Sequence, residues 1–162
     1  MSDIAWDDVR VDFDPEMNGT LPDVVVEHVG MGDWQAVLDL VRTQGWTYEY
    51  EGDAGNCDDL PTAQEFFAQR DRGAPIKVWP VAGIQVNFWA LDVDTIDFDV
   101  DLRELQGQER LDRLCDLIRT IGRLLHKPVE MMAEGYSPPR YRILGYDVHA
   151  DQVVMLATPT TN

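Results

Sequence analysis

The chain has 162 residues, of which 30 are Asp or Glu and 13 are Lys or Arg, so its formal net charge is −17. This charge argues against direct binding to nucleic acid or to an anionic membrane, because both require a basic surface. The length suits one domain that buries roughly 70% of its unfolded surface. The 44% of hydrophobic residues is typical of a globular chain and not of a disordered acidic tail.

The sequence predicts neither a membrane span nor a secretory signal, since it has no run of about 18 apolar residues and no basic segment followed by an apolar one at its start. The two cysteines, Cys57 and Cys115, have no metal-binding spacing. We expect them to be reduced thiols in a cytoplasmic protein. We treat 1–162 as a single domain that begins with an acidic segment, 1–21, and ends in a flexible tail, 158–162.

In the first half of the chain, apolar alternation predicts strands and one-sided apolar stripes predict helices. The run DVVVEHV is β-branched, which is typical of a buried strand. Thr62 and Glu65 have capping-box spacing, which indicates the start of a short helix. We expect strands over 9–13, 23–29 and 46–51, a helix over 33–45 and a short helix over 62–72.

In the second half, Ala82 and Gly83 separate two alternating runs and predict a tight hairpin. A long apolar stripe opposite a face of mixed charge predicts the strongest helix of the chain. We expect strands over 76–81, 84–91, 95–102, 129–133, 141–146 and 152–157, and a helix over 106–126.

This order mixes helices with antiparallel strands, which indicates an α+β fold: a mostly antiparallel sheet with the two main helices on one face. A strand–helix–strand unit occurs twice, at 23–51 and at 95–133. The pattern is compatible with a ferredoxin-like core that carries an inserted hairpin and additional C-terminal strands.

The segment LDVDTIDFDVDL, residues 91–102, places five aspartates in twelve positions, which raises the possibility of a calcium loop. An EF-hand loop that starts at Asp97 would need Gly at position six and Glu at position twelve, but Leu102 and Gln108 stand there. On a strand, alternate carboxylates lie about 6.6–7 Å apart, which is too far to share one ion comfortably. The sequence therefore predicts no metal site and no cofactor.

No coherent catalytic set is visible either. His28, His126 and His149 fall on a strand, a helix end and a turn, and neither cysteine has the flanking signature of a cysteine hydrolase. No glycine-rich phosphate loop is present. We therefore predict no catalytic residues. A small enzyme stays open as an alternative if the fold forms a deep pocket with His28 or His149 beside a carboxylate.

The alternation instead predicts an acidic face with exposed tryptophans, a composition that fits a binding surface for a basic protein. Two alternatives stay open: the N- or C-terminal segment covers the tryptophans, or the acidity serves solubility or adaptation to salt. The predicted partner-binding residues are Asp92, Asp94, Asp97, Asp99, Asp101, Trp89, Trp79, Glu49 and Glu51.

The segment FDVDLRELQGQERLDRLCDLIRTIGRLLHKPVEMMAEG, 98–135, resembles a strand–helix–strand unit of small acidic proteins of actinobacteria. In size and charge the whole chain resembles the small acidic immunity proteins of bacterial toxin–immunity systems. That resemblance implies a single-domain, non-enzymatic inhibitor that covers the basic active site of a cognate toxin. A nucleic-acid mimic that occupies a DNA-binding protein is the alternative, and it would need two phosphate-like rows of carboxylates in register.

Overall fold

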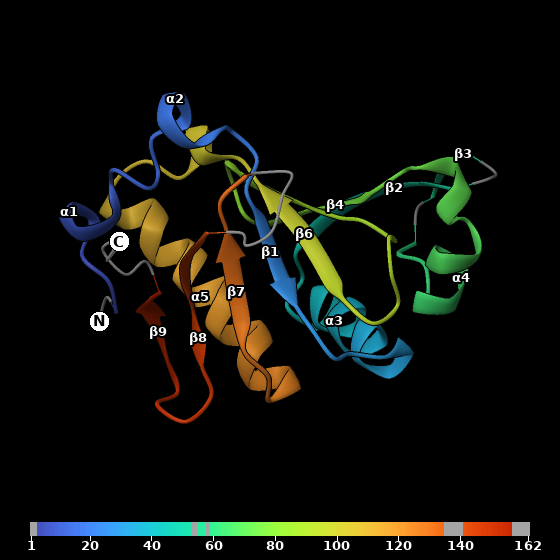
Figure 1. Ribbon diagram of the computed structural model, residues 1–162. Helices are drawn as coiled ribbons and strands as arrows, with labels where there is room; N and C mark the ends of the chain where they lie inside the picture. Colours follow the sequence, from blue (N-terminus) through green and yellow to red (C-terminus); the bar gives the residue numbers. More distant parts are fainter. Residues whose placement is uncertain (1–2, 53–54, 58, 135–140, 157–162) are drawn as a thin grey trace.

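The computed structural model describes residues 3–52, 55–57, 59–134 and 141–156, so the predicted tail at 158–162 lies outside the described residues. Within them, nine strands form one antiparallel sheet in the order β3-β2-β4-β5-β6-β1-β7-β8-β9. The helices α3 and α5 lie behind this sheet in the view of Figure 1 and contact each other. The predicted α+β fold with both main helices on one face is confirmed.

The elements of the first half of the chain are α1 (Trp6–Val9), α2 (Pro15–Asn18), β1 (Asp23–Val26), α3 (Met31–Thr43), β2 (Thr47–Gly52), β3 (Gly55–Cys57), α4 (Ala63–Ala68) and the 3-10 helix η1 (Arg70–Arg72). Those of the second half are β4 (Ile76–Val81), β5 (Ile84–Phe88), β6 (Ile96–Val100), the 3-10 helix η2 (Leu102–Glu104), α5 (Gln108–Leu125), β7 (Val129–Met132), β8 (Arg142–Asp147) and β9 (Gln152–Met155).

The ferredoxin-like core is present in the middle of the sheet. Strand β1 lies between β6 and β7, and β5 lies on the other side of β6, so the two strand–helix–strand units interleave. The segment 46–51, which the sequence had suggested as the second strand of this core, instead forms β2 in the inserted part with β3, α4 and β4. Strand β5 takes that central place, and β8 and β9 extend the other edge.

The predicted strand over 9–13 is wrong. Val9 ends the short helix α1 and the following residues form turns, with Val9 and Phe13 fully buried and Val11 68% exposed. The spacing of four residues between Val9 and Phe13 suits one face of a helical turn as well as every second position of a strand. Alternation over five residues did not distinguish the two periods.

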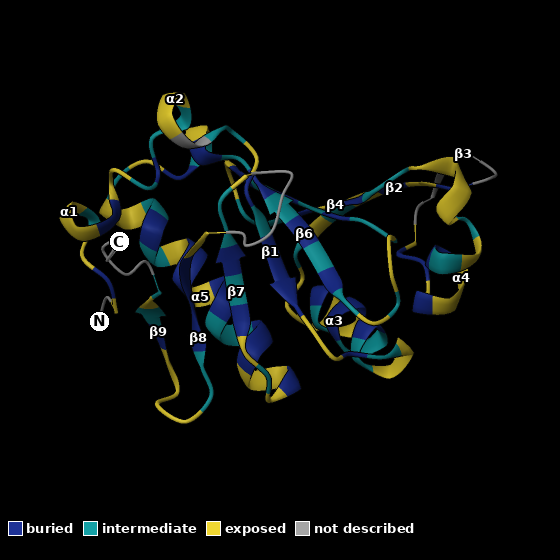
Figure 2. Ribbon diagram, in the orientation of Figure 1, coloured by how far each residue is buried: buried dark blue, intermediate teal, exposed yellow. Residues whose placement is uncertain are grey.

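The core lies between the sheet and the two main helices. The inward side chains of the central strands are fully buried, among them Val24, Phe88 and Phe98, and they belong to one core cluster with the apolar stripe of α5, which includes Leu111 and Ile118. Burying one such side chain stabilises the fold by about 1.5–3 kcal/mol. Figure 2 shows buried and intermediate residues along β1, β6 and β7, while exposed residues gather on α1, α2, α4 and the loop ends.

The hairpin of β4 and β5 turns at Ala82 and Gly83, as expected, and Gly83 has the positive φ of 88° that such a turn favours. Among the described helices, none has the length and apolar character needed to cross a membrane.

Candidate functional site

The side of the sheet opposite α3 and α5 carries four carboxylates on its three central strands. In register, Asp23 of β1 lies across from Asp99 of β6, while Val25 of β1 has Asp97 of β6 on one side and Glu130 of β7 on the other. Because side chains alternate along a strand, these residues all point away from the buried Val24 and Val26. We call Asp23, Asp97, Asp99 and Glu130 the acidic face.

Asp99 of the acidic face is held by two side-chain hydrogen bonds. Its two carboxylate oxygens accept hydrogen bonds of 2.7 Å from the Asn87 amide and the Trp89 indole N–H of the neighbouring strand and its end. Gln85 in turn donates to the Asn87 carbonyl oxygen at 2.8 Å. This network fixes the Trp89 ring beside the carboxylate and joins the β4–β5 hairpin to β6.

Burial raises the pKa of Asp99 above its ordinary value, the hydrogen bonds from Asn87 and Trp89 oppose that rise, and the nearby charges of Asp23 and Asp101 add to it. The charged form of Asp99 is therefore disfavoured, because the carboxylate is half-buried and lies next to like charges. Directly opposed like charges on neighbouring strands destabilise a sheet.

Asp101 follows the same alternation in the sequence but has a local role in the structure. It is the N-cap residue of η2: its carboxylate accepts from the Arg103 backbone N–H at 2.9 Å and binds the Arg103 guanidinium at 3.0 and 2.7 Å. The hydrogen bonds from Arg103 lower the pKa of Asp101, against the effect of its burial. Asp101 is thus paired within its own turn, although its charge still adds to the rise in the pKa of Asp99.

Asp92 and Asp94 lie in the turn between β5 and β6, away from the strand row. The Asp92 carboxylate accepts from the Asp94 backbone N–H at 2.9 Å, a turn-forming bond of the kind that aspartate often makes. Both residues are exposed. They extend the acidic surface at one end of β6 without belonging to the half-buried cluster.

Glu49 and Glu51 are exposed on β2, in the same sheet but at a distance from the acidic face. Strands β4 and β5 separate β2 from β6, which corresponds to about 14 Å at the usual strand spacing. The register row from Glu49 to Asp99 passes through Lys77 and Asn87, so a positive and a neutral residue interrupt the negative charge.

The two predicted tryptophans lie at opposite ends of the β4–β5 hairpin. Lys77 pairs with Asn87, and Trp79 and Trp89 lie two residues away from this pair in opposite directions, about 13 Å apart along the strands. Both indoles are half-buried. Of the two, Trp89 contacts the acidic face, whereas Trp79 pairs with Thr47 on β2.

The sequence prediction missed Asp23 and Glu130. Both alternate with buried valines and methionines on strands that the sequence did predict, at 23–29 and 129–133. Their position beside Asp97 and Asp99 follows from the strand order β6-β1-β7 that a ferredoxin-like core imposes. Applying that order to the alternation would have found them.

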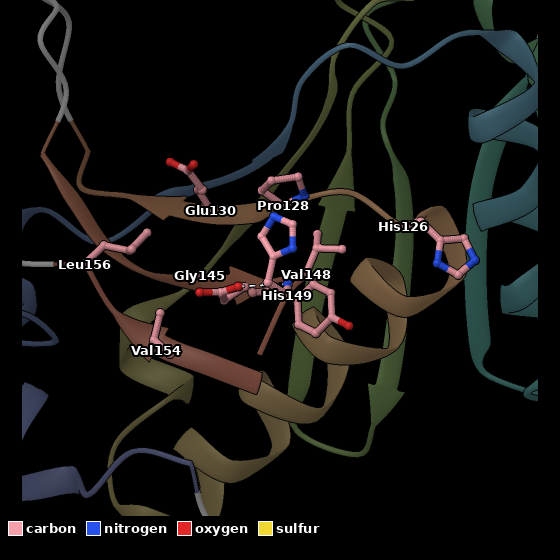
Figure 3. Close-up of a pocket in the computed structure, with 10 residues that line it drawn as sticks. His126, Pro128, Glu130, Gly145, Val148, His149, Val154 and Leu156 are labelled. Carbon is pink, nitrogen blue, oxygen red and sulfur yellow. Dashed lines mark hydrogen bonds between the residues drawn. The ribbon is translucent and has the colours of Figure 1, made fainter. Parts of the chain in front are cut away.

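A pocket of about 480 Å³ adjoins the acidic face where β7, β8 and β9 lie side by side. In register, Gly145 of β8 stands between Glu130 and Val154; it adds no side chain to the row of outward residues, and the end of the Leu156 side chain lies over it. Figure 3 shows His149 beside Pro128, with Glu130, Val154 and Leu156 around Gly145 and His126 farther away at the end of α5. We call this the Gly145 pocket; its principal lining residues are Pro128, Glu130, Gly145, His149, Val154 and Leu156.

All three histidines of the chain lie around this part of the sheet, since His126 and His149 line the Gly145 pocket and His28 lines a smaller hollow of about 90 Å³ that shares Pro128 and Glu130 with it. The carboxylates there have structural partners: Asp147 accepts from the backbone N–H groups of His149 and Ala150, and Glu130 pairs with Arg142 at 3.4 Å.

Among the described residues, the His149 imidazole has no hydrogen bond to either carboxylate of the pocket. A nucleophile–base–carboxylate arrangement, in which a third group orients the base, is therefore not assembled there. The described residues also contain no group of three or more His, Cys, Asp or Glu side chains placed to hold a metal ion. The surface presents carboxylates for charge pairing and apolar side chains around the Gly145 pocket.

Comparison of the chain with protein-family models, curated proteins and solved structures gave no match.

Proposed function

We propose that the protein is a non-enzymatic, cytoplasmic binding protein for a basic partner, and specifically an immunity protein that blocks the active-site region of a cognate toxin. The observation that supports this most is the acidic face. It places four carboxylates in register on the three central strands, next to the Trp89 ring, in a chain of net charge −17.

The arrangement of these carboxylates fits a cationic partner better than it fits solubility alone. Solubility requires only exposed charges, and Glu49 or Glu51 would serve it. Asp23 and Asp99 instead oppose each other on neighbouring strands, and Asp99 is half-buried, at a cost in stability. Lysine or arginine side chains of a partner would relieve this repulsion on binding.

In the proposed complex, basic side chains around the toxin's substrate pocket pair with Asp23, Asp97 and Glu130, and the sheet covers the pocket entrance. Trp89 supplies a rigid aromatic contact, of the kind that dominates interface energies. The net charge accelerates association by electrostatic steering, so the rate should fall as ionic strength rises.

The test begins with the gene next to the one that encodes this chain. Its product is expressed alone and together with this protein, and growth of the host and the affinity of the purified pair are measured. The informative variant is Asp23→Asn/Asp97→Asn/Glu130→Gln, which removes three charges and leaves the Asp99 network intact. At roughly 1 kcal/mol for each partly exposed charge pair, we expect affinity to fall about 100-fold.

The matched control is Glu49→Gln/Glu51→Gln/Asp71→Asn, which removes the same number of charges from exposed positions on β2 and η1. It should keep most of the affinity and slow association only slightly. Equal losses in the two triple variants would show that overall charge, and not the acidic face, determines binding. If the neighbouring product is harmless and does not bind, the immunity assignment is wrong.

A further inference from the structure

The Gly145 pocket continues the row of outward residues that crosses the acidic face. From β6 to β9 this row reads Asp97, Val25, Glu130, Gly145 and Val154, so the hollow begins one strand beyond the last carboxylate. A glycine inside a strand weakens the sheet and often marks a place where a ligand or another chain approaches closely. A β-carbon at Gly145 would lie 2.7 Å from the Val129 carbonyl oxygen and 2.9 Å from Leu156.

The walls and the edge of the pocket differ in chemistry. Val148, Val154, Leu156 and Pro128 provide apolar surface, while the Glu130 carboxylate forms the edge toward the acidic face. The Glu130 side chain retains 25% exposure and already lies 3.4 Å from one guanidinium, that of Arg142. An apolar stem that ends in a cationic head would match both surfaces, with the head joining Arg142 at the Glu130 carboxylate.

We infer that the Gly145 pocket receives an arginine side chain of the partner, with its aliphatic stem against Val154, Leu156 and Pro128 and its guanidinium at Glu130. This inference rests on the proposed function, because it names the anchor by which a basic partner engages the acidic face. The pocket volume of about 480 Å³ is ample for one side chain. Arginine is the cation that pairs with a carboxylate through two parallel N–H bonds, and it is enriched among the residues that dominate interfaces.

The pocket can be tested without the toxin, with N-acetyl-arginine amide as the probe. The full chain is labelled with ¹⁵N and titrated while its amide signals are followed by NMR. We expect saturable shifts, at millimolar probe concentrations, for Gly145, Val148 and His149. N-acetyl-citrulline amide has nearly the same shape without the charge, and it should bind at least about threefold more weakly if the charge pair contributes as partly exposed pairs do.

Val154→Phe is the variant that closes the pocket, because the larger aromatic side chain takes up space that Val154 now lines. It should abolish the saturable shifts. Met155→Phe, at the neighbouring and exposed position, is the matched control and should bind the probe like the parent. Glu130→Gln should weaken binding about threefold. An unchanged pattern of amide signals away from β9 verifies that each variant is folded.

Shifts that do not saturate and spread over all acidic residues would overturn the inference, as would equal binding of the citrulline probe. Binding that survives Val154→Phe would also overturn it. Failure of the proposed function would give a different result. The probe would still saturate the pocket, while the neighbouring gene product would not bind this protein and its effect on host growth would not change when the two are expressed together.

Discussion

Replacing Asp99 with alanine tests whether the acidic face is built into the sheet or is only a hydrated surface. The change removes two hydrogen bonds of 2.7 Å, from Asn87 and from the Trp89 indole. Both donors are half-buried and can reach water afterwards, so each bond contributes about 1 kcal/mol. Relief of the repulsion with Asp23 and of the partial burial of the Asp99 charge together return about 0.5 kcal/mol. We therefore expect the free energy of unfolding to fall by about 1.5 kcal/mol.

Urea unfolding, followed by tryptophan fluorescence and by circular dichroism, measures this change, and the denaturant dependence should stay constant if the unfolded state is unaffected. The control is Glu51→Ala, an exposed position on β2, which should change stability by no more than about 0.5 kcal/mol. A double-mutant cycle with Trp89→Phe isolates the indole bond, and we expect a coupling energy of about 0.5–1 kcal/mol.

A stability for Asp99→Ala equal to or above that of the parent would refute the reasoning. It would mean that the network between the β4–β5 hairpin and β6 contributes nothing, and that Asp99 is an ordinary solvated charge. A coupling energy of zero with a normal loss in each single variant would refute only the part that concerns Trp89.

Four further predictions concern pH and packing. Burial raises the pKa of Asp99 above 3.8, so the native state binds a proton at this carboxylate more readily than the unfolded state does. Lowering the pH from neutral should therefore stabilise the parent relative to Asp99→Asn. Urea titrations at several pH values measure this difference. For Asp151 the sign is opposite, because the hydrogen bonds from Arg123 and then Tyr146 lower its pKa from 3.8 to about 2. The contribution of ionised Asp151 to the free energy of unfolding is therefore complete above pH 3.8 and is lost as the pH falls through about 2. Acid unfolding of Asp151→Asn should lack that part of the transition. Gly122→Ala should lower the free energy of unfolding by about 1–3 kcal/mol, because the new β-carbon would lie 2.1 Å from the buried Tyr146 ring. Gly32→Ala in α3, with open space around it, should by contrast leave thermal unfolding unchanged or stabilise the protein by up to about 1 kcal/mol.

Most of the predicted helices and strands follow from the spacing of apolar residues along the chain. The β-branched run at 23–29 and the stripe of α5 each specify an element by local pattern, and two strand–helix–strand units suggested the core. Which strand pairs with which is a non-local property, so 46–51 was placed in the core although β5 lies there. The predicted side-chain alternation was nevertheless correct for 46–51 and for β5, because alternation depends only on the pleat of the strand.

The candidate site was predictable only in part, for the same reason. Alternation put Asp97 and Asp99 on the outward face of β6, but it treated Asp101 in the same way. The strand ends at Val100, and Asp101 turns its carboxylate to Arg103 two residues later. The Gly145 pocket has no sequence signature of its own, because it arises from three strands whose register sets a glycine between Glu130 and Val154.

Asp3 connects the start of the chain to the edge of the sheet. Its carboxylate accepts from the Val153 backbone N–H at 3.0 Å and pairs with Arg119 of α5, so one residue of the acidic segment joins the outermost strand to a helix. Strand β9 is the last in the sheet order, and open strand edges are templates on which other chains can add. By occupying one donor on that edge with a charged group anchored to α5, Asp3 removes one backbone position at which another strand could pair.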